Sequence, residues 1–459
     1  MLFPVLYSVI LSLNPSALSR HTNPMGYLSP VYYVLSRVSA ALRRKQMRKN
    51  GVDPCTVKFY SVSDETLSTP SIGNVHGVRN LYRDARNTDD VNEIEKKLSS
   101  LESAAATVIR NLHAVLSDSS TSDSPVFTIS REETETLRKF LFIMHFRNER
   151  LAKSFFDPEH PDNLLGRKRM LYMQKKLGLG SSTDMWLHFL RYYLDTPHTQ
   201  ILRHAAESMK SLPPNFGIGQ NVELDPDVDH FEAVIYQQQA GMYYLGIWRA
   251  SPGQEFVLGH NSFGLWEGKC GPSAELHKIF IISPQIAIIL RLNALRPGAG
   301  GEGLRNMCRS EFVDFPLPGA RPVYASGLAG LNVGEIKATD AAGPAAMAGI
   351  LSNFTSQHNP RDMFGFPITS LTPDQTHVVN SILLFNVRRT GSVTFLSETS
   401  MLETALRYEA DFRNGLHRED GKVKGLIHHL EQRRAADDEQ TFVLEHYLEK
   451  WSRRQEEVI

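Results

Sequence analysis

The strongest constraint on the fold comes from the stretch Glu255 to Pro284, which carries the densest β-strand signal in the chain. Its centre is a polar turn over residues 259–262, with apolar runs on both sides. Glycine and asparagine suit such turns because they tolerate unusual backbone angles, and rigid strands hold a polar turn side chain in a fixed direction. We therefore predict a β-hairpin over 255–267 and a further strand over 278–282, with the turn as the first candidate for a functional site.

Helical periodicity dominates the rest of the chain. Residues 89–116 predict a long amphipathic helix, because apolar residues recur at steps of three and four on one face. That apolar stripe consists of Ile94, Leu98, Leu101, Ala105, Val108, Leu112 and Val115. Two capping boxes, Ser130 with Glu133 and Thr372 with Gln375, predict helix starts, since each pair satisfies free backbone N–H groups of a first turn.

The same patterns predict the remaining elements. Helices are expected over residues 27–48, 131–155, 184–194, 199–209, 286–295, 373–387 and 398–414, and two more within 423–454. Strands are expected over 56–62 and 392–396. Residues 231–249 are expected to form a helix that passes into a strand. Residues 297–349 are rich in Gly, Ala and Pro and predict irregular connections with short strands. We expect an α+β fold that is predominantly helical, in which a helical N-terminal half packs on a small antiparallel sheet and further helices close it.

The 459 residues are expected to form one main domain. Residues 21–415 constitute it, with a helical half over 21–212 and a sheet-containing half over 213–415. Residues 416–459 are expected to form charged C-terminal helices. Residues 1–20 are interpreted as an extension outside the fold or a buried N-terminal segment. A secretion signal is the alternative, because Leu2 to Leu13 is apolar enough for a short signal-peptide core, although the positive charges that precede such a core are missing.

Charge and cysteine usage restrict the partners and the compartment. Lys+Arg and Asp+Glu both number 50, so the net charge is +0, whereas binding to bulk nucleic acid or to an anionic membrane normally requires a basic surplus. The three cysteines, Cys55, Cys270 and Cys308, form neither a CxxC pair nor an even disulfide set. This favours a reducing, cytoplasmic location with plain thiols. The sequence indicates no specific partner and no oligomeric state.

Motifs for cofactors and metals are absent or out of context. Residues 298–303 match GxGxxG, but no strand precedes them and no βαβ unit surrounds them, so a flexible loop is the better interpretation. Asp225, Asp227 and Asp229 resemble the start of a calcium loop, yet its sixth position lacks glycine and its twelfth is Tyr236. No HExxH or paired-histidine metal motif occurs. We therefore predict no cofactor and no metal.

Scattered polar residues beside apolar runs are the remaining candidates for a pocket. A buried polar side chain requires partners, because leaving it unsatisfied costs about 1–3 kcal/mol. Each residue alone is explained by capping or by bracing a loop, and only convergence in space would favour a functional pocket. The candidates are His21, Arg147, Asn261, Glu267, Ser283 and Asn380.

Taken in order, several short motifs resemble one known family. They are His21-x-x-Pro24-x-x-Tyr27-Leu28, Val78-Arg79-Asn80-Leu81-Tyr82, Leu101-Glu102, Leu137-Arg138-Lys139-Phe140-Leu141 with Arg147, Glu255-Phe256-Val257-Leu258 before Asn261, Ile282-Ser283-Pro284, and Asn380. Their order and spacing resemble the family called domain of unknown function 4238, found in fungi and bacteria, over residues 21–415. The resemblance implies a shared fold and matching positions rather than a reaction, because the family has no established activity.

The turn at the centre of the stretch departs from that family's pattern. The family usually has a Thr/Ser-Asp-Asn-Pro-like turn there, whereas this chain has His260-Asn261-Ser262-Phe263 and so lacks the acidic residue and the proline. Carboxylate-dependent chemistry at the turn is therefore disfavoured. The leading hypothesis is an intracellular ligand- or partner-binding or regulatory protein with a polar pocket near the 255–284 hairpin. The alternative is a hydrolase-like enzyme, with nucleic acid as one substrate class and His21 or His260 as acid/base.

Overall fold

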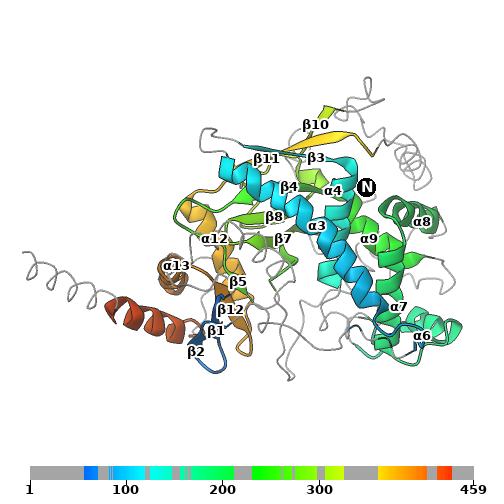
Figure 1. The fold of residues 1–459 in the computed structure, drawn as a ribbon, viewed down its shortest axis with the longest axis horizontal. Coiled ribbons are helices and arrows are strands. Elements are labelled where there is room, and N and C mark those ends of the chain that lie inside the picture. Colours follow the sequence, from blue (N-terminus) through cyan, green and yellow to red (C-terminus); the bar gives the residue numbers. More distant parts are fainter. Residues whose placement is uncertain are drawn as a thin grey trace, which may run out of the picture.

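The fold is a mixed arrangement of helices and strands (Figure 1). The computed structural model describes residues 56–70, 82, 84, 86–118, 125–146, 156–160, 163, 167–210, 230–259, 262–270, 274–296, 305–324, 360–410 and 421–436. Its helices are α3 (Glu93–Asp118), α4 (Arg131–Phe146), α6 (Arg167–Lys176), α7 (Ser182–Asp195), α8 (His198–Lys210), α9 (Phe231–Gly241), η5 (Asn293–Leu295), α12 (Pro373–Phe385) and α13 (Glu398–Ala410), with a further helix over 424–436.

The strands form two sheets. They are β1 (Lys58–Ser61), β2 (Thr66–Ser68), β3 (Val126–Ser130), β4 (Tyr243–Arg249), β5 (Leu258–Gly259), β6 (Leu265–Cys270), β7 (Ala274–Ser283), β8 (Ile286–Leu292), β9 (Cys308–Arg309), β10 (Arg321–Tyr324), β11 (Met363–Ser370) and β12 (Ser392–Phe395). The larger sheet has eight strands in the order β10-β11-β4-β8-β7-β6-β9, with β3 paired to β11 outside this path. Neighbouring strands of this sheet are antiparallel, except β11 and β4, which are parallel. The smaller sheet is antiparallel, in the order β2-β1-β12-β5.

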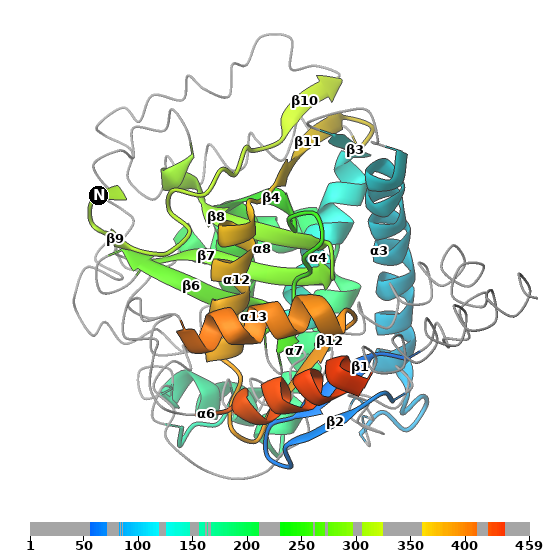
Figure 2. The ribbon, with the colours of Figure 1, turned by 90° about the vertical axis from the view of Figure 1, so that its left-hand side faces the viewer.

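Helices cover both faces of the larger sheet (Figures 1 and 2). One side is covered by the helices α3, α4, α7, α8 and α9. They pack against every second residue of the strands, for example Ile288 and Leu290 of β8. On the other side, α12, α13 and the smaller sheet pack against the intervening residues, such as Ala287 and Ile289. We call these two sides the α4 face and the α12 face. The central strands are thus buried on both sides.

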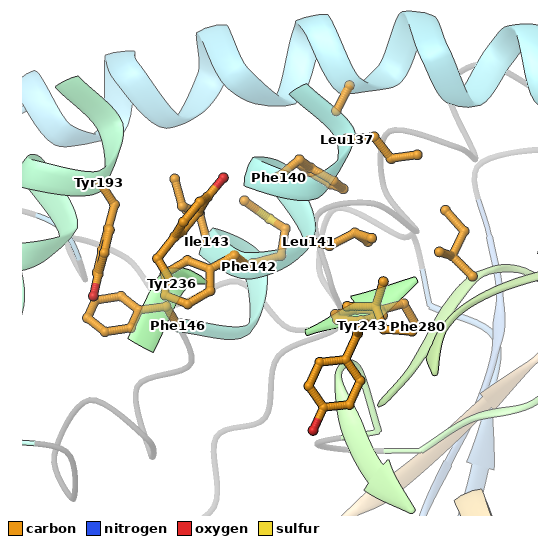
Figure 3. Packing of buried hydrophobic residues seen from close by; sticks show 14 of the residues in the cluster. Leu137, Phe140, Leu141, Phe142, Ile143, Phe146, Tyr193, Tyr236, Tyr243 and Phe280 are labelled. Atoms are coloured by element: carbon orange, nitrogen blue, oxygen red, sulfur yellow. The ribbon is translucent and has the colours of Figure 1, made fainter. Parts of the chain in front are cut away.

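Helix α4 buries seven of its 16 residues on the α4 face, most of them in its C-terminal half (Figure 3). The ring of Phe142 meets Tyr193 of α7 and Tyr236 of α9 edge-on, each at a centroid distance of 4.8 Å. Phe146 meets Tyr193 in the same way at 4.9 Å. Edge-to-face aromatic pairs add about 0.5–1.5 kcal/mol each beyond the area they bury. They fix the C-terminal end of α4, and with it His145, against α7 and α9.

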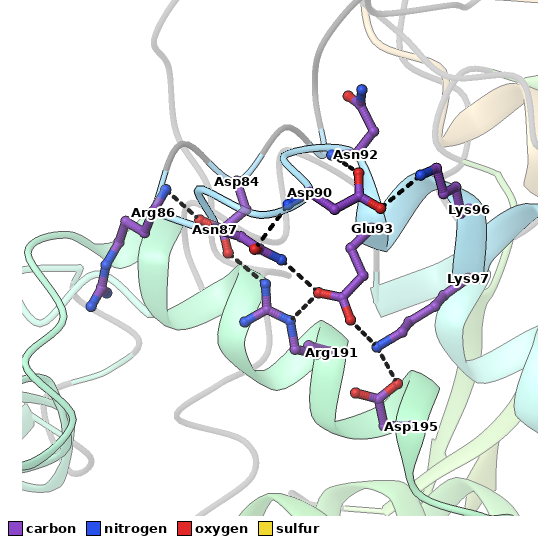
Figure 4. Close-up of polar contacts among 10 residues, drawn as sticks. All are labelled: Asp84, Arg86, Asn87, Asp90, Asn92, Glu93, Lys96, Lys97, Arg191 and Asp195. Atoms are coloured by element: carbon purple, nitrogen blue, oxygen red, sulfur yellow. Dashed lines mark hydrogen bonds and ion pairs between the residues drawn. The ribbon is translucent and has the colours of Figure 1, made fainter.

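A group of ion pairs joins the start of α3 to α7 (Figure 4). Arg191 Nη2 lies 2.6 Å from Asp84 Oδ2, and Arg191 Nε lies 3.4 Å from Glu93 Oε2. Lys97 Nζ bridges Glu93 Oε1 at 2.5 Å and Asp195 Oδ1 at 2.6 Å. Because these side chains are partly exposed, each pair stabilises the fold by about 1 kcal/mol or less, and the group orients the two helices more than it holds them together.

Local sequence signals were reliable where they were strong. The stripe predicted within 89–116 faces the core of the α4 face, with Ile94 and Leu98 buried on α3. Both capping boxes are present. Glu133 N donates to Ser130 Oγ at 3.2 Å while Ser130 N donates to Glu133 Oε2 at 2.8 Å. Thr372 and Gln375 exchange the same pair of bonds, at 3.2 and 3.0 Å.

The expectation of a predominantly helical fold on a small antiparallel sheet is wrong. The larger sheet has eight strands, one of its pairings is parallel, and a second sheet of four strands packs beside α12 and α13. One reason is β8, because residues 286–295 were predicted to be a helix. All seven residues of β8 are buried. A strand covered on both faces is apolar at nearly every position, so the alternation that separates a strand from a helix is missing.

The predicted hairpin over 255–267 is also wrong. β5 pairs with β12 in the smaller sheet, whereas β6 pairs with β7 and β9 in the larger one. The polar turn therefore connects two sheets. At Gly259 the packing is close, because a Cβ there would lie 2.5 Å from both Ser262 Oγ and Val387 Cγ2, so glycine is favoured at this position. Turn chemistry indicates where the chain reverses but not which strand each flank will pair with.

None of the helices that the structure describes combines the length and the apolar run needed to cross a bilayer.

Candidate functional site

Strand β7 carries two buried polar side chains next to each other in sequence, His277 and Lys278, which are 0% and 3% exposed. Successive residues of a strand point to opposite faces. His277 therefore lies on the α12 face and Lys278 on the α4 face. The stretch around β7 thus builds two separate polar sites, one on each side of the sheet.

The site on the α12 face is a chain of three buried side chains from neighbouring strands. Glu267 of β6 is the register partner of His277, and His277 is the register partner of Arg291 on β8. His277 Nδ1 lies 2.9 Å from Glu267 Oε2, and Arg291 Nε donates to His277 Nε2 at 2.9 Å. Since Arg291 donates, Nε2 must be the lone-pair nitrogen, so the proton of the neutral imidazole is on Nδ1 and is donated to Glu267.

The segment after β9 covers this chain. Ser310 Oγ and the backbone N–H of Glu311 each donate to Glu267, both at 2.8 Å. Arg291 Nη2 donates to the carbonyls of Phe312 and Phe315, at 2.8 and 2.9 Å. Every member therefore has partners within the protein. A satisfied network of this kind specifies packing, and its hydrogen bonds leave no group directed at a ligand.

The grouping of Ser310, His277 and Glu267 does not have the geometry of a nucleophile relay. In such a relay the base accepts the hydroxyl proton on one ring nitrogen and is oriented through the other. Here Ser310 Oγ and Glu267 Oε2 both lie near Nδ1, at 3.2 and 2.9 Å. Nε2 is already the acceptor for Arg291. Burial lowers the pKa of His277 and the Arg291 charge lowers it further, although Glu267 raises it, so the ring stays neutral.

The site on the α4 face is organised differently, around Lys278. Its Nζ donates to Gln239 Oε1 of α9 at 2.6 Å. It also lies 4.7 Å from the ring centre of Trp266 and 5.7 Å from that of Phe280. An ammonium group has three N–H donors, and among the described residues it meets one oxygen and two aromatic faces. The buried amine of Lys278 thus has fewer hydrogen-bond acceptors than donors among the described residues. Arg291 on the opposite face, in contrast, donates to three acceptors.

The end of α4 lies beside this lysine. His145 Nδ1 is 3.5 Å from the carbonyl oxygen of Phe263, in the segment that leads into β6. A Cβ on Gly264 would lie 2.6 Å from His145 Nδ1, so glycine, here with φ +78°, is required for this close approach. His145, Phe263 and Trp266 are all partly exposed. The Lys278 site therefore borders the protein surface on the side of these three residues.

Burial lowers the pKa of Lys278 to about 7, while the charge of Glu275 acts in the opposite direction. Burial also lowers the pKa of His145 well below its ordinary value, the Lys278 charge lowers it further, and the Phe263 carbonyl raises it. The lysine amine is consequently close to half neutral at neutral pH and His145 is neutral. Lysines desolvated in this way are the ones that act as nucleophiles or bases in proteins.

The structure gives separate surroundings to three of the residues predicted to line a pocket. Glu267 belongs to the network on the α12 face. Ser283 Oγ accepts from Gln285 N at 3.2 Å in the β7–β8 turn. Asn380 of α12 donates to Glu255 O at 2.8 Å and accepts from Val257 N at 3.1 Å. No hydrogen bond or ion pair joins Glu267, Ser283 and Asn380 to one another in the described part of the chain.

His21, Arg147 and Asn261, together with His260, lie outside the described residues. Their convergence with the other candidates into one pocket stays a prediction. Two of them have described neighbours at the Lys278 site: Arg147 follows Phe146 at the end of α4, and Asn261 precedes Ser262 and Phe263.

Sequence reasoning missed Lys278, Gln239, Trp266, His145, His277 and Arg291. One signal was available, because His277 and Lys278 interrupt the apolar run from Leu276 to Ile282, and a charged residue is rarely fully buried without a specific partner. Within the described ranges no group of His, Cys, Asp and Glu side chains is gathered as a metal ion would require.

Comparison with known proteins gives one match. The model of the family described as "Protein of unknown function (DUF4238)" matches residues 53–390. Searches of the curated proteins and of the solved structures each return no match.

Proposed function

The chain belongs to the DUF4238 family, whose description assigns no activity, and we propose from the site itself that it is an intracellular ligand-binding protein that holds a small molecule at Lys278. The ligand would place an acceptor oxygen, of a carboxylate or a carbonyl group, against Lys278 Nζ. Its apolar part would pack beside Trp266 and Phe263. This puts the polar pocket expected from the sequence near β6 and β7, on the α4 face of the sheet.

One observation carries the proposal: Lys278 Nζ is buried and has a single oxygen acceptor, Gln239 Oε1, among the described residues. Burying a charged group without full hydrogen bonding costs several kcal/mol, so a chain under selection for stability alone would place an apolar residue there. Strongly perturbed titratable groups cluster at functional sites for this reason. An oxygen of a bound ligand would supply the missing acceptor.

The surroundings favour a ligand with an apolar or aromatic part. Trp266 and Phe263 present partly exposed rings beside the buried amine, and Phe263 stacks edge-on against Phe280 at 5.1 Å. Small-molecule sites combine mostly apolar walls with a few fixed polar groups. Lys278 and Gln239 provide those polar groups here. An intracellular location is part of the proposal and rests on the cysteine pattern.

The alternative, a hydrolase, has less support. His277 is neutral and both of its ring nitrogens are engaged, so it has no free position for a substrate or a water molecule. The other proposed acid/base residues, His21 and His260, lie outside the described residues. No observation in the described part of the chain favours hydrolysis over binding.

A comparison of two lysine variants tests the proposal. Benzoate supplies a carboxylate and an aromatic ring, and benzaldehyde a carbonyl and the same ring. Each compound would be added at millimolar concentration to wild type, Lys278→Met and Lys269→Met, and Tm would be recorded. Lys269 is the matched control because it is an exposed lysine on the neighbouring strand, β6, where it is the register partner of Glu275. A ligand that binds only the folded state raises Tm.

We expect at least one of the two compounds to raise the Tm of wild type and of Lys269→Met but not that of Lys278→Met. Borohydride reduction followed by peptide mapping separates the two ligand chemistries, because an imine between benzaldehyde and Lys278 is reduced to a stable secondary amine, whereas bound benzoate forms no covalent adduct. Equal shifts in all three proteins, or no shift in any of them with either compound, would contradict a site at Lys278.

A further inference from the structure

Cys270 and Cys308 lie directly opposite each other in the sheet. They are far apart in sequence, yet β6 and β9 pair them in antiparallel register, with Lys269 opposite Arg309 at the next position. Both thiols are partly exposed and both pack at the edge of the core on the α4 face. Their spacing in the sequence matches no disulfide or metal motif, so only the pairing of the two strands brings them together.

The register permits a covalent link. Directly opposite residues of an antiparallel pair have Cα atoms about 4.5–5.5 Å apart. Disulfides form at Cα separations of about 4.4–6.8 Å, so the backbone would not have to rearrange. The two side chains are also in contact in the reduced protein, because Cys308 and Cys270 share a hydrogen bond between their thiols.

We propose that Cys270 and Cys308 form a redox-active dithiol, which a hydroperoxide converts into an intramolecular disulfide across the β6–β9 edge of the sheet.

The chemistry assigns different roles to the two cysteines. Burial, and next the hydrogen bond with Cys270, raise the pKa of Cys308 to about 12, although the nearby Arg305 charge lowers it. Cys308 therefore holds its proton more tightly than an ordinary thiol, and we write the first step with Cys270 as the attacking sulfur, since the thiolate is the nucleophile. Cys270 Sγ attacks one peroxide oxygen and the O–O bond breaks. For hydrogen peroxide, this yields a sulfenic acid at Cys270 and one molecule of water.

The second step closes the link. Cys308 Sγ attacks Cys270 Sγ, the S–O bond breaks, and the departing hydroxide takes up the Cys308 proton to form a second molecule of water. Two thiols have then lost two electrons and two protons, and one hydrogen peroxide molecule has become two of water. A thiol reductant reverses the reaction by exchange.

The link has a structural consequence because β9 leads directly into the segment that covers the α12 face. Strand β9 is two residues long and lies at the end of the strand order, paired with β6. The next residues, Ser310 and Glu311, cover Glu267 through hydrogen bonds of 2.8 Å. A disulfide between β6 and β9 would hold this covering segment in place. We therefore expect the oxidised protein to be more resistant to heat than the reduced one, by a few degrees in Tm.

The experiment uses the full chain, reduced, freed of reductant and exposed to a stoichiometric amount of hydrogen peroxide. Remaining thiols are labelled with a maleimide, and peptides are mapped by mass spectrometry with and without dithiothreitol. Cys55→Ser is the matched control, because it removes the third cysteine and leaves the pair intact. Cys270→Ser and Cys308→Ser each remove one partner.

Wild type and Cys55→Ser should each lose the mass of two hydrogen atoms, yield a cross-linked peptide pair that contains Cys270 and Cys308, and recover both thiols on reduction. Cys270→Ser and Cys308→Ser should each form no intramolecular cross-link, and Cys308→Ser should accumulate a sulfenic acid at Cys270 that dimedone traps. A disulfide that involves Cys55, a link between two molecules, or oxidation to sulfinic acid without cross-linking would overturn the proposal. The mapping of wild type is decisive even where a serine variant fails to fold.

Discussion

Arg291 Nε donates a hydrogen bond to His277 Nε2 over 2.9 Å in the interior of the larger sheet. The two residues are register partners on β8 and β7 and are 2% and 0% exposed. The bond fixes the tautomer of His277 and directs its Nδ1 proton at Glu267. One cation, one anion and one neutral ring are thus buried as a unit, and removal of any member leaves the others without compensation.

Replacing Arg291 by methionine should therefore be strongly destabilising. Glu267 would lose its buried counter-charge, and the carbonyls of Phe312 and Phe315 would lose their donor. Breaking a buried ion pair from one side costs about 3–5 kcal/mol. Urea unfolding of Arg291→Met measures the loss, with Arg309→Met as the control, because Arg309 is exposed on β9 and should change stability by about 0.5 kcal/mol or less. Equal losses in the two variants would contradict the network.

The neutral state of His277 predicts a dependence of stability on pH. Its pKa is lowered in the folded protein, so as pH falls below the unfolded value of about 6.5 the unfolded chain binds a proton that the folded chain does not. Stability is therefore lost as pH falls, by at most about 1.4 kcal/mol per pH unit from this group.

The variant His277→Gln isolates that contribution. Its overall stability should be lower than that of wild type, but its free energy of unfolding should fall less steeply as pH falls through the unfolded pKa of about 6.5. The polar and charged groups that contact His277 are Glu267, Arg291 and Ser310, and all three remain in the variant. Denaturant unfolding at a series of pH values gives both slopes. Parallel curves for the two proteins would show that His277 does not resist protonation.

Lys278 on the opposite face leads to the reverse expectation, a gain in stability on substitution. Its pKa of about 7, against about 10.4 when unfolded, means that the fold opposes its charge. Below a pH of about 7 both states are protonated and the full cost applies, up to about 5 kcal/mol at about 1.4 kcal/mol per pKa unit. As pH rises from there towards the unfolded pKa, the unfolded chain holds more protons, so stability rises with pH and the cost disappears.

Lys278→Met should therefore raise the free energy of unfolding at neutral pH by about 1–3 kcal/mol, less than the full cost because Gln239 loses its partner. The double variant Lys278→Met with Gln239→Leu should gain more than the single one. For both, the gain over wild type should shrink as pH approaches the unfolded lysine pKa, with His145 and Glu275 unchanged nearby. A loss of stability at neutral pH in the double variant would contradict this account. A gain, combined with lost ligand binding, is the pattern of a functional residue kept at the expense of stability.

The parts of the fold that could be predicted from the sequence are those with local causes. The stripe on α3 and the boxes at Ser130 and Thr372 depend on neighbours within one or two turns, and they appear as predicted. The eight-stranded sheet depends on which distant segments pair, and β8 shows why this was missed. A strand between two covered faces is apolar almost throughout and leaves no periodicity to detect.

The candidate sites also combine features that have a local cause in the sequence with features that depend on distant segments. Asn380 and Glu267 were recognised as polar residues beside apolar runs, but their partners, Glu255 and His277, became apparent only once distant elements were placed side by side. Lys278 was placed in a strand but its burial was not foreseen, because the helix that covers it, α9, is a separate element whose position the strand's own residues do not indicate. The family match over residues 53–390 confirms the resemblance and adds no chemistry.

Asn380 provides the test of whether a predicted pocket residue is a brace. Its side chain donates to Glu255 O and accepts from Val257 N, and it is 1% exposed on α12. It thereby holds the segment before β5 against the helix. Asn380→Leu keeps the size of the side chain but removes the bonds to a buried carbonyl and a buried N–H, so we expect a loss of about 2–6 kcal/mol, at about 1–3 kcal/mol for each group. Urea unfolding provides the measurement.

Asn386, at the end of the same helix, is the matched control. It is exposed at the helix end and its Nδ2 donates to Ile382 O within the helix, at 2.8 Å. Asn386→Leu should cost about 1 kcal/mol or less, because the groups it leaves can be reached by water. If Asn380 did not brace this segment, Asn380→Leu would fold with nearly the stability of wild type, as Asn386→Leu should. A large loss of stability in Asn380→Leu alone assigns the residue to the bracing of residues 255–257.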